Sequence, residues 1–198
     1  METLDPVIGR DVRERFANIG RDLFLSGAIS SHGGNLSELR GNRIFITRRS
    51  AMLGRLGEDD VVWTQVAACE RDEDCSRELI VHRAIYESTD ARAIVHAHPV
   101  HTIARSLREG VIVPIDSEAR YVLGEVVPVV SAEETIGSAE AAVLLADALK
   151  QHPVAVLRSH GVFARGATLE EAFYHVSCLE VACRILDIDD AAGGWSRE

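Results

Sequence analysis

The spacing of hydrophobic residues along this chain changes several times, which predicts helices that alternate with strands. In five segments apolar side chains recur every three or four positions, as they do on the buried face of an amphipathic helix. Ser76 and Thr168 are placed to cap two of these segments at their N-termini. The helices are predicted over residues 7–26, 77–87, 100–108, 138–150 and 169–186.

Short runs rich in β-branched residues lie between these helices and predict the strands of a sheet. Because several connections are short enough for hairpins, we expect a mixed or largely antiparallel sheet. The interleaved elements, without repeats or a linker, indicate an α/β fold with helices layered on the sheet. One domain is expected over residues 1–198, with a frayed tail at 187–198. The predicted strands cover residues 44–47, 61–64, 93–98, 111–113, 126–130, 154–157 and 161–166.

Length, composition and charge narrow the class of protein. The chain has 198 residues, 46% of them hydrophobic, so it can bury a sizeable core. Its 21 lysines and arginines against 31 acidic residues give a formal net charge of −10, which argues against a nucleic-acid partner held by charge. No apolar run approaches the roughly 20 residues of a membrane span, and the mixed charges of residues 1–15 are unlike a signal peptide. We therefore expect a cytoplasmic protein that is not associated with membranes.

Three histidines at the ends of predicted strands form a candidate metal site. His96 and His98 occupy positions i and i+2 of one strand, so their imidazoles point to the same face. Such a pair alone is weak evidence, but His160 follows another apolar strand and lies beside a glycine. Three histidine ligands leave a fourth position open, which is the arrangement of catalytic zinc sites.

Glu78 is a candidate fourth ligand and general base. It lies one turn before His82, on the helix that leads to the strand of His96. A carboxylate that leaves the metal when substrate arrives is well placed to carry a proton. The alternative is a carboxylate in the first turn of a helix, where the helix dipole favours it. His82 is either a neighbour of Glu78 or an ordinary core histidine.

A glycine-rich turn over residues 33–37 is a candidate anion site. Glycines let successive backbone N–H groups point toward one anion. Asn35 adds an amide donor, and Thr47, Arg48 and Arg49 reach the same region from the next strand. The alternative is an ordinary hairpin turn closed by an asparagine hydrogen bond.

The order of these segments resembles the class II aldolase/adducin-head family over residues 7–186. The resemblance implies an α/β/α sandwich with a central sheet, assembled as a homotetramer whose active sites lie between adjacent subunits. The most specific matches are Gly34-Asn35-Leu36-Ser37, Ser76-Arg77-Glu78 followed by His82, Val95-His96-Ala97-His98, and Ser159-His160-Gly161.

The resemblance also implies roles for individual residues. His96, His98 and His160 would bind a divalent metal, zinc being usual and cobalt or manganese the alternatives. Glu78 would be the catalytic base and would ligate the metal in the resting enzyme. Four positions match the lining of the phosphate pocket in the family's aldolases: Gly34, Asn35, Thr47 and Ser76.

The chain departs from the family pattern at the anion pocket and at the proton donor. Arg49 and Arg77 stand where small residues are usual, and their guanidinium groups bind phosphate or carboxylate. His32 replaces the usual small residue before the glycines. The family's tyrosine proton donor has no direct match, so Glu118, with Tyr121 as the second choice, is the candidate, contributed by a neighbouring subunit.

The function expected from these features is that of a zinc-dependent aldolase, an aldehyde-lyase of carbohydrate metabolism. It would cleave a small ketose 1-phosphate through an enediolate into dihydroxyacetone phosphate and an aldehyde. One alternative keeps the metal site and changes the reaction, to that of a methylthioribulose-1-phosphate dehydratase or a ribulose-5-phosphate 4-epimerase. A second alternative is a non-catalytic, adducin-like interaction module.

Overall fold

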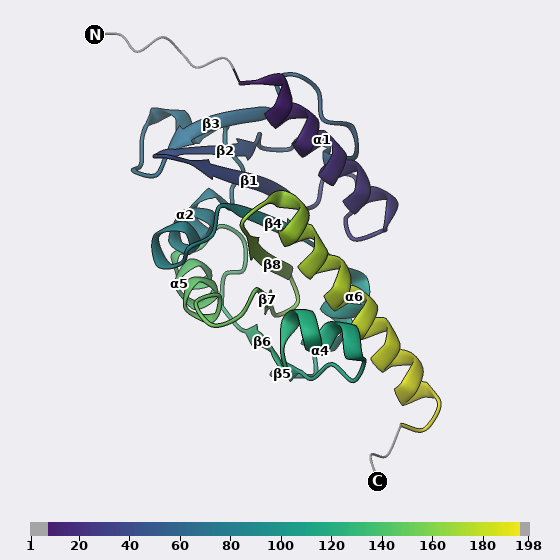
Figure 1. The fold of residues 1–198 in the computed structure, drawn as a ribbon. Coiled ribbons are helices and arrows are strands. Elements are labelled where there is room, and N and C mark those ends of the chain that lie inside the picture. The colour runs from purple at the N-terminus through teal and green to yellow at the C-terminus, as the bar shows by residue number, and fades with distance from the viewer. Residues whose placement is uncertain (1–7, 195–198) are drawn as a thin grey trace, which may run out of the picture.

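The computed structural model describes residues 8–194, and these form a mixed sheet with helices on both faces (Figure 1). The eight strands lie in the order β3-β2-β1-β4-β8-β7-β6-β5. Every neighbouring pair is antiparallel except β6 and β7, which run parallel. The largely antiparallel α/β fold is therefore confirmed. The strands are β1 (Asn35–Arg40), β2 (Arg43–Thr47), β3 (Val61–Gln65), β4 (Ala93–Ala97), β5 (Val111–Ile112), β6 (Val127–Val130), β7 (Val154–Leu157) and β8 (Gly161–Gly166).

Two hydrophobic clusters, one on each face, hold the helices to the sheet. Strand residues alternate between them: Val95 of β4 joins the first cluster, whereas its neighbour Ile94 joins the second. The first cluster includes residues of α1, α4 and α6, and the second includes residues of α2 and α5. The helices are α1 (Arg10–Leu25), α2 (Leu79–Ser88), α3 (Val100–Ser106), α4 (Ser117–Leu123), α5 (Ala139–Ala148) and α6 (Leu169–Ala191), with short 3₁₀ turns at Leu53–Arg55 and Glu70–Asp74. No helix within residues 8–194 is long and apolar enough to cross a membrane.

Helix α6 continues beyond the point where the sequence pattern predicts its end. The expectation of a frayed tail is wrong for residues 187–191, which are helical, and residues 195–198 lie outside the described part of the chain. Arg105 of α3 explains the extension, because its guanidinium is paired with Asp187 at 3.0 Å and with Asp190 at 2.5 Å. These ion pairs join residues far apart in the sequence, so no local pattern reveals them.

Strand β1 and helix α4 are two elements that the sequence pattern misses. Strand β1 begins at Asn35 and lies between β2 and β4, although its polar residues are typical of a turn. Ser37 and Glu38 are nevertheless buried, and Glu38 is paired with Arg15 at 2.9 Å. Their hydrogen bonds and ion pairs compensate for the loss of water, which the hydrophobic pattern cannot show.

Candidate metal and anion site

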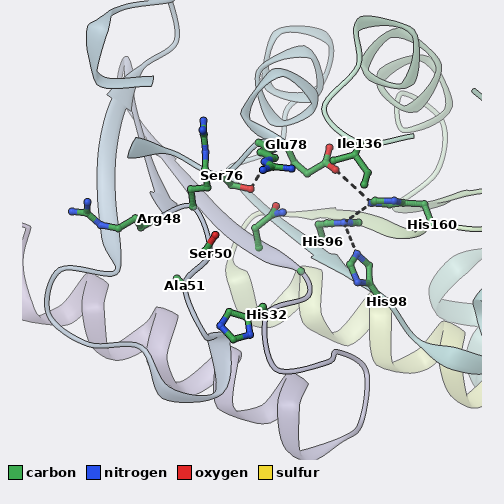
Figure 2. Close-up of a pocket in the computed structure, with 14 residues that line it drawn as sticks. His32, Arg48, Ser50, Ala51, Ser76, Glu78, His96, His98, Ile136 and His160 are labelled. Carbon is green, nitrogen blue, oxygen red and sulfur yellow. Dashed lines mark hydrogen bonds and ion pairs between the residues drawn. The ribbon is translucent and has the colours of Figure 1, made fainter. Parts of the chain in front are cut away.

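The ends of two adjacent central strands bring the three predicted histidines together (Figure 2). His96 lies in β4, directly opposite Phe163 of β8. His98 follows the end of β4, and His160 precedes the start of β8. Because β4 and β8 are antiparallel, the end of one strand meets the start of the other, and residues 64 positions apart become neighbours.

The side-chain nitrogens of these histidines converge on one point. Nε2 of His96 lies 3.0 Å from Nε2 of His98 and 3.1 Å from Nε2 of His160. Nδ1 of His96 lies 2.8 Å from the carbonyl oxygen of Val162, which can only accept a hydrogen bond. The proton of His96 therefore resides on Nδ1, and the lone pair of Nε2 points toward the other two rings.

This arrangement fits a tetrahedral divalent metal. With metal–nitrogen bonds of about 2.05 Å, two imidazole nitrogens in a tetrahedral site lie about 3.3 Å apart, close to the separations found here. The ligand atoms of His96, His98 and His160 all lie within 4.8 Å of one another. Burial, and then the neighbouring rings of His98 and His160, lower the pKa of His96 well below its ordinary range. The His96 imidazole is thus neutral near pH 7, which is the form that binds a metal.

Glu78 brings a carboxylate close to the three histidines. It occupies the N-cap position of α2, and its side chain is buried. Oε1 lies 3.5 Å from Nε2 of His160, and Oε2 accepts a hydrogen bond of 3.2 Å from the backbone N–H of Gly137. One oxygen of this carboxylate is held by the backbone, while the other faces the histidines.

Two glycines allow the backbone to pass close to the histidines. Gly34 has a φ of +77°, and a Cβ at this position would lie 2.6 Å from the carbonyl oxygen of His96. At Gly161 a Cβ would collide with the carbonyl oxygen of Ala97 and with the ring of His98. A larger residue at either position would displace a strand end that holds a candidate ligand.

A cavity of about 210 Å³ extends from the histidines to the glycine-rich turn. Five of the six residues predicted to bind an anion line it: Gly34, Asn35, Ser76, Arg49 and Arg77. The cavity is also lined by His32, Arg48, Ser50, Ala51 and Ile136, in addition to Glu78 and the three histidines.

The arginines around this cavity differ in what they already bind. Nε of Arg48 donates to the carbonyl oxygen of Asp59 at 2.8 Å, and its Nη1 lies 3.2 Å from the Asp74 carboxylate. Figure 2 shows the Arg48 side chain turned away from the histidines. Arg49 and Arg77 have exposed side chains for which the described part of the chain shows no ion pair. These two guanidinium groups are therefore available to an anion in the cavity.

Three predicted site residues do not line this cavity in the described chain. Thr47 is buried, and its hydroxyl accepts a hydrogen bond from the backbone N–H of Leu36. This hydroxyl therefore stabilises the backbone of the glycine-rich turn. Glu118 lies on α4 and accepts a hydrogen bond from Tyr174, and Tyr121 is 90% exposed. Their assignment as proton donors stays a prediction that requires another subunit.

Some site residues give no signal in the sequence. Ile136 lines the cavity, and the N–H of Gly137 holds Glu78 from a loop 59 positions away. A backbone N–H is present at every position except proline, so only the fold reveals which one is used. A glycine directly before the N-cap Ser138 indicates a special backbone conformation at this loop, but not the bond that its N–H makes.

The buried histidines predict a pH dependence for the metal-free protein. Burial lowers the pKa of His82 to about 3, and burial together with His160 lowers the pKa of His98 to about 4. In the unfolded chain both groups titrate near pH 6.5. Below that pH the unfolded state binds more protons, so the free energy of unfolding falls as the pH is lowered toward 5.

Urea unfolding of the chelator-treated protein at pH 7, 6 and 5 measures this effect. The expected loss approaches about 1.4 kcal/mol per pH unit for each histidine once the pH is below about 6. Zinc should reduce the slope by holding His98 in its neutral form. A free energy of unfolding that is constant or increases from pH 7 to 5 would contradict the prediction.

Comparison with known proteins agrees with this geometry. The family model of the class II aldolase and adducin N-terminal domain matches residues 14–186. The chain belongs to this family. The L-fuculose-1-phosphate aldolase of Thermus thermophilus superposes on this class II aldolase-family chain with a TM-score of 0.89 at 33% identity, covering 94% of this chain and 98% of that one.

Two curated relatives show the range of activities named for similar proteins. An L-fuculose phosphate aldolase of Methanococcus maripaludis is 30% identical over 149 residues, which are 75% of this chain and 81% of that protein. A probable bifunctional methylthioribose-1-phosphate isomerase/methylthioribulose-1-phosphate dehydratase of Nocardia farcinica is 27% identical over 190 residues. That match includes 87% of this chain, which spans about a third (34%) of the Nocardia protein.

Proposed function

We propose that this class II aldolase-family chain is a divalent-metal-dependent aldolase that cleaves a small ketose 1-phosphate into dihydroxyacetone phosphate and an aldehyde. The observation that carries the proposal is the convergence of three imidazole nitrogens, at 3.0 and 3.1 Å, with the Glu78 carboxylate beside them. Zinc is the proposed metal, with cobalt or manganese as alternatives. His96, His98 and His160 would hold it, with Glu78 as a fourth ligand in the resting enzyme.

Each part of the cavity has a distinct task in this reaction. When bound, the metal supplies Lewis-acid polarisation of the substrate carbonyl. Glu78 transfers a proton to and from the substrate carbon, since its Oε1 faces the metal position and its Oε2 stays hydrogen-bonded to Gly137. Gly34, Asn35, Ser76, Arg49 and Arg77 bind the phosphate at the other end of the cavity.

The second proton, on the distal hydroxyl, needs a donor that this cavity does not supply within the described chain. We propose that Glu118, with Tyr121 as the second choice, reaches the cavity of a neighbouring subunit from helix α4. The 90% exposure of Tyr121 leaves it free to make such a contact. Assembly as a homotetramer with sites between subunits belongs to the same proposal.

Product analysis tests the proposed reaction. Protein loaded in turn with zinc, cobalt and manganese is incubated with a panel of ketose 1-phosphates and non-phosphorylated keto acids. The expected result is release of dihydroxyacetone phosphate and an aldehyde from one of the ketose phosphates. Preference for a carboxylated substrate without phosphate would contradict the phosphate assignment. Arg49 and Arg77 would then bind the carboxylate of the substrate.

The Nocardia relative gives a second candidate reaction on the same site. A methylthioribulose-1-phosphate dehydratase would remove water from the substrate and keep its carbon chain intact, and an epimerase would also leave the chain whole. Neither releases two carbon fragments, so the same product analysis separates them from the aldolase. Metal content separates all three enzymes from an adducin-like module: below about 0.2 metal per chain after zinc addition, catalysis at this site would be excluded.

A further inference from the structure

Four buried polar groups form a continuous chain of hydrogen bonds that ends at the anion side of the cavity. The Tyr86 hydroxyl lies 2.7 Å from Oγ of Ser37, which lies 2.6 Å from Nδ1 of His82. Nε2 of His82 lies 2.6 Å from Oδ1 of Asn35. Each of the four residues is at most 6% exposed. Tyr86 and His82 come from α2, and Ser37 and Asn35 lie two positions apart on β1, so both face that helix.

The direction in which each proton is donated along this series of hydrogen bonds follows from the groups that it joins. Burial lowers the pKa of His82 to about 3 and raises that of Tyr86 above its ordinary range. His82 is therefore neutral, with one ring N–H, and Tyr86 keeps its proton. Within the described residues Ser37 is the hydrogen-bond partner of the Tyr86 hydroxyl, so that proton is directed at Ser37. The opposite direction would leave a buried hydroxyl proton without an acceptor, which is costly.

Once Tyr86 donates to Ser37, the remaining protons are determined. The Ser37 hydroxyl donates to Nδ1 of His82, so the ring proton lies on Nε2 and is donated to Oδ1 of Asn35. The amide N–H₂ of Asn35 then points away from His82. Asn35 also lines the cavity, so an amide held in this way can present its two donors to an anion bound there.

We propose that His82 is a positioning residue, which holds the Asn35 amide with its donors toward the substrate's anionic group. The hydrogen bonds from Tyr86 to Ser37 and from Ser37 to His82 fix the ring proton of His82 for this task. Without this relay of hydrogen bonds, the Asn35 amide can also adopt the flipped orientation, which presents its oxygen to the anion and repels it. The proposal rests on the proposed function only in taking Asn35 as an anion donor. It explains the burial of a histidine and a tyrosine that the proposed reaction does not use directly.

The tautomer of His82 provides a test that needs neither a variant nor turnover. Ring nitrogen-15 chemical shifts of the zinc-loaded protein report which nitrogen carries the proton. We expect Nε2–H for His82, and a protonated Nδ1 would overturn the proposal. In Tyr86→Phe the terminal donor is lost, so we expect His82 to populate both tautomers.

Phosphate binding tests the consequence of this arrangement. Isothermal titration of zinc-loaded protein with inorganic phosphate should give an affinity about three- to tenfold weaker for Tyr86→Phe than for wild type. Tyr86 does not line the cavity in the described chain, so a direct contact does not account for such a loss. The matched control is Thr89→Val, which removes a hydroxyl that donates to the Ile85 carbonyl on the same helix and leaves the relay intact.

The outcomes separate this proposal from the proposed reaction. If Tyr86→Phe binds phosphate as tightly as wild type while Asn35→Ala binds it more weakly, the relay is refuted and the anion pocket stands. If Asn35→Ala has no effect, Asn35 is not an anion donor and both assignments fail. If no ketose phosphate is cleaved but the tautomer and phosphate affinity respond as expected, the relay stands and the proposed reaction fails.

Discussion

A Glu78→Gln variant is expected to keep its metal and to lose about 10²–10⁴-fold in kcat, the range usual for removal of a general acid–base group. Glutamine preserves the shape of the side chain, and its amide oxygen can still accept the hydrogen bond from the N–H of Gly137. It cannot accept a proton from the substrate carbon at neutral pH. The three histidines stay in place, so zinc content measured by mass spectrometry should remain near one per chain.

The matched control for this variant is Glu170→Gln. Glu170 is an exposed carboxylate in the first turn of α6, so it tests for the loss of one negative charge at a helix start. It is expected to retain wild-type kcat and zinc content. Full activity of zinc-loaded Glu78→Gln would show that another group moves the proton.

A His160→Gln variant is expected to bind zinc well over 100-fold more weakly and to lose detectable activity without excess metal. His160 is less buried than His96, so its replacement tests the metal site with less disturbance of the core. Its Nε2 lies 3.1 Å from that of His96, and a tetrahedral site with two remaining imidazoles has lost one of its strong ligands. Zinc titration with a competing chelator measures the dissociation constant.

Thermal unfolding provides a second measurement for His160→Gln. Free zinc at 100 times the wild-type dissociation constant should stabilise the wild-type protein by about 2.7 kcal/mol, and the variant by much less. His152→Gln serves as the control, because His152 lies in the turn after α5 and outside the cavity. Equal zinc stabilisation of wild type and His160→Gln would place the metal elsewhere.

The sequence predicts the metal side of the cavity more completely than the anion side. His96 and His98 are recognisable because alternate residues of a strand share a face, and His160 because it follows an apolar strand. On the anion side the prediction included Thr47, whose hydroxyl is used by the backbone of Leu36. Sequence spacing gives distance along the chain, and it does not show which hydroxyl has already found a buried partner.

The missed elements have a common physical cause. Strand β1 is central in the sheet yet polar, because Ser37 bonds to His82 and Tyr86, and Glu38 bonds to Arg15. The last turns of α6 persist because Arg105 holds Asp187 and Asp190. In each case polar residues far apart in the sequence stabilise one another, whereas the hydrophobic period reports only burial of apolar groups. The resemblance to a known family predicts which segments far apart in the sequence come together, and the hydrophobic pattern does not.

The metal side and the anion side of the cavity are built on different kinds of backbone, so we expect them to differ in how well they tolerate substitutions. Two of the histidines adjoin strand ends and one lies within β4, at the centre of the sheet, where Gly161 permits no side chain. Arg49 and Arg77 stand on exposed connecting segments, where substitutions are usually well tolerated. We therefore expect substitutions in those segments to change anion binding and to leave the proposed metal site intact.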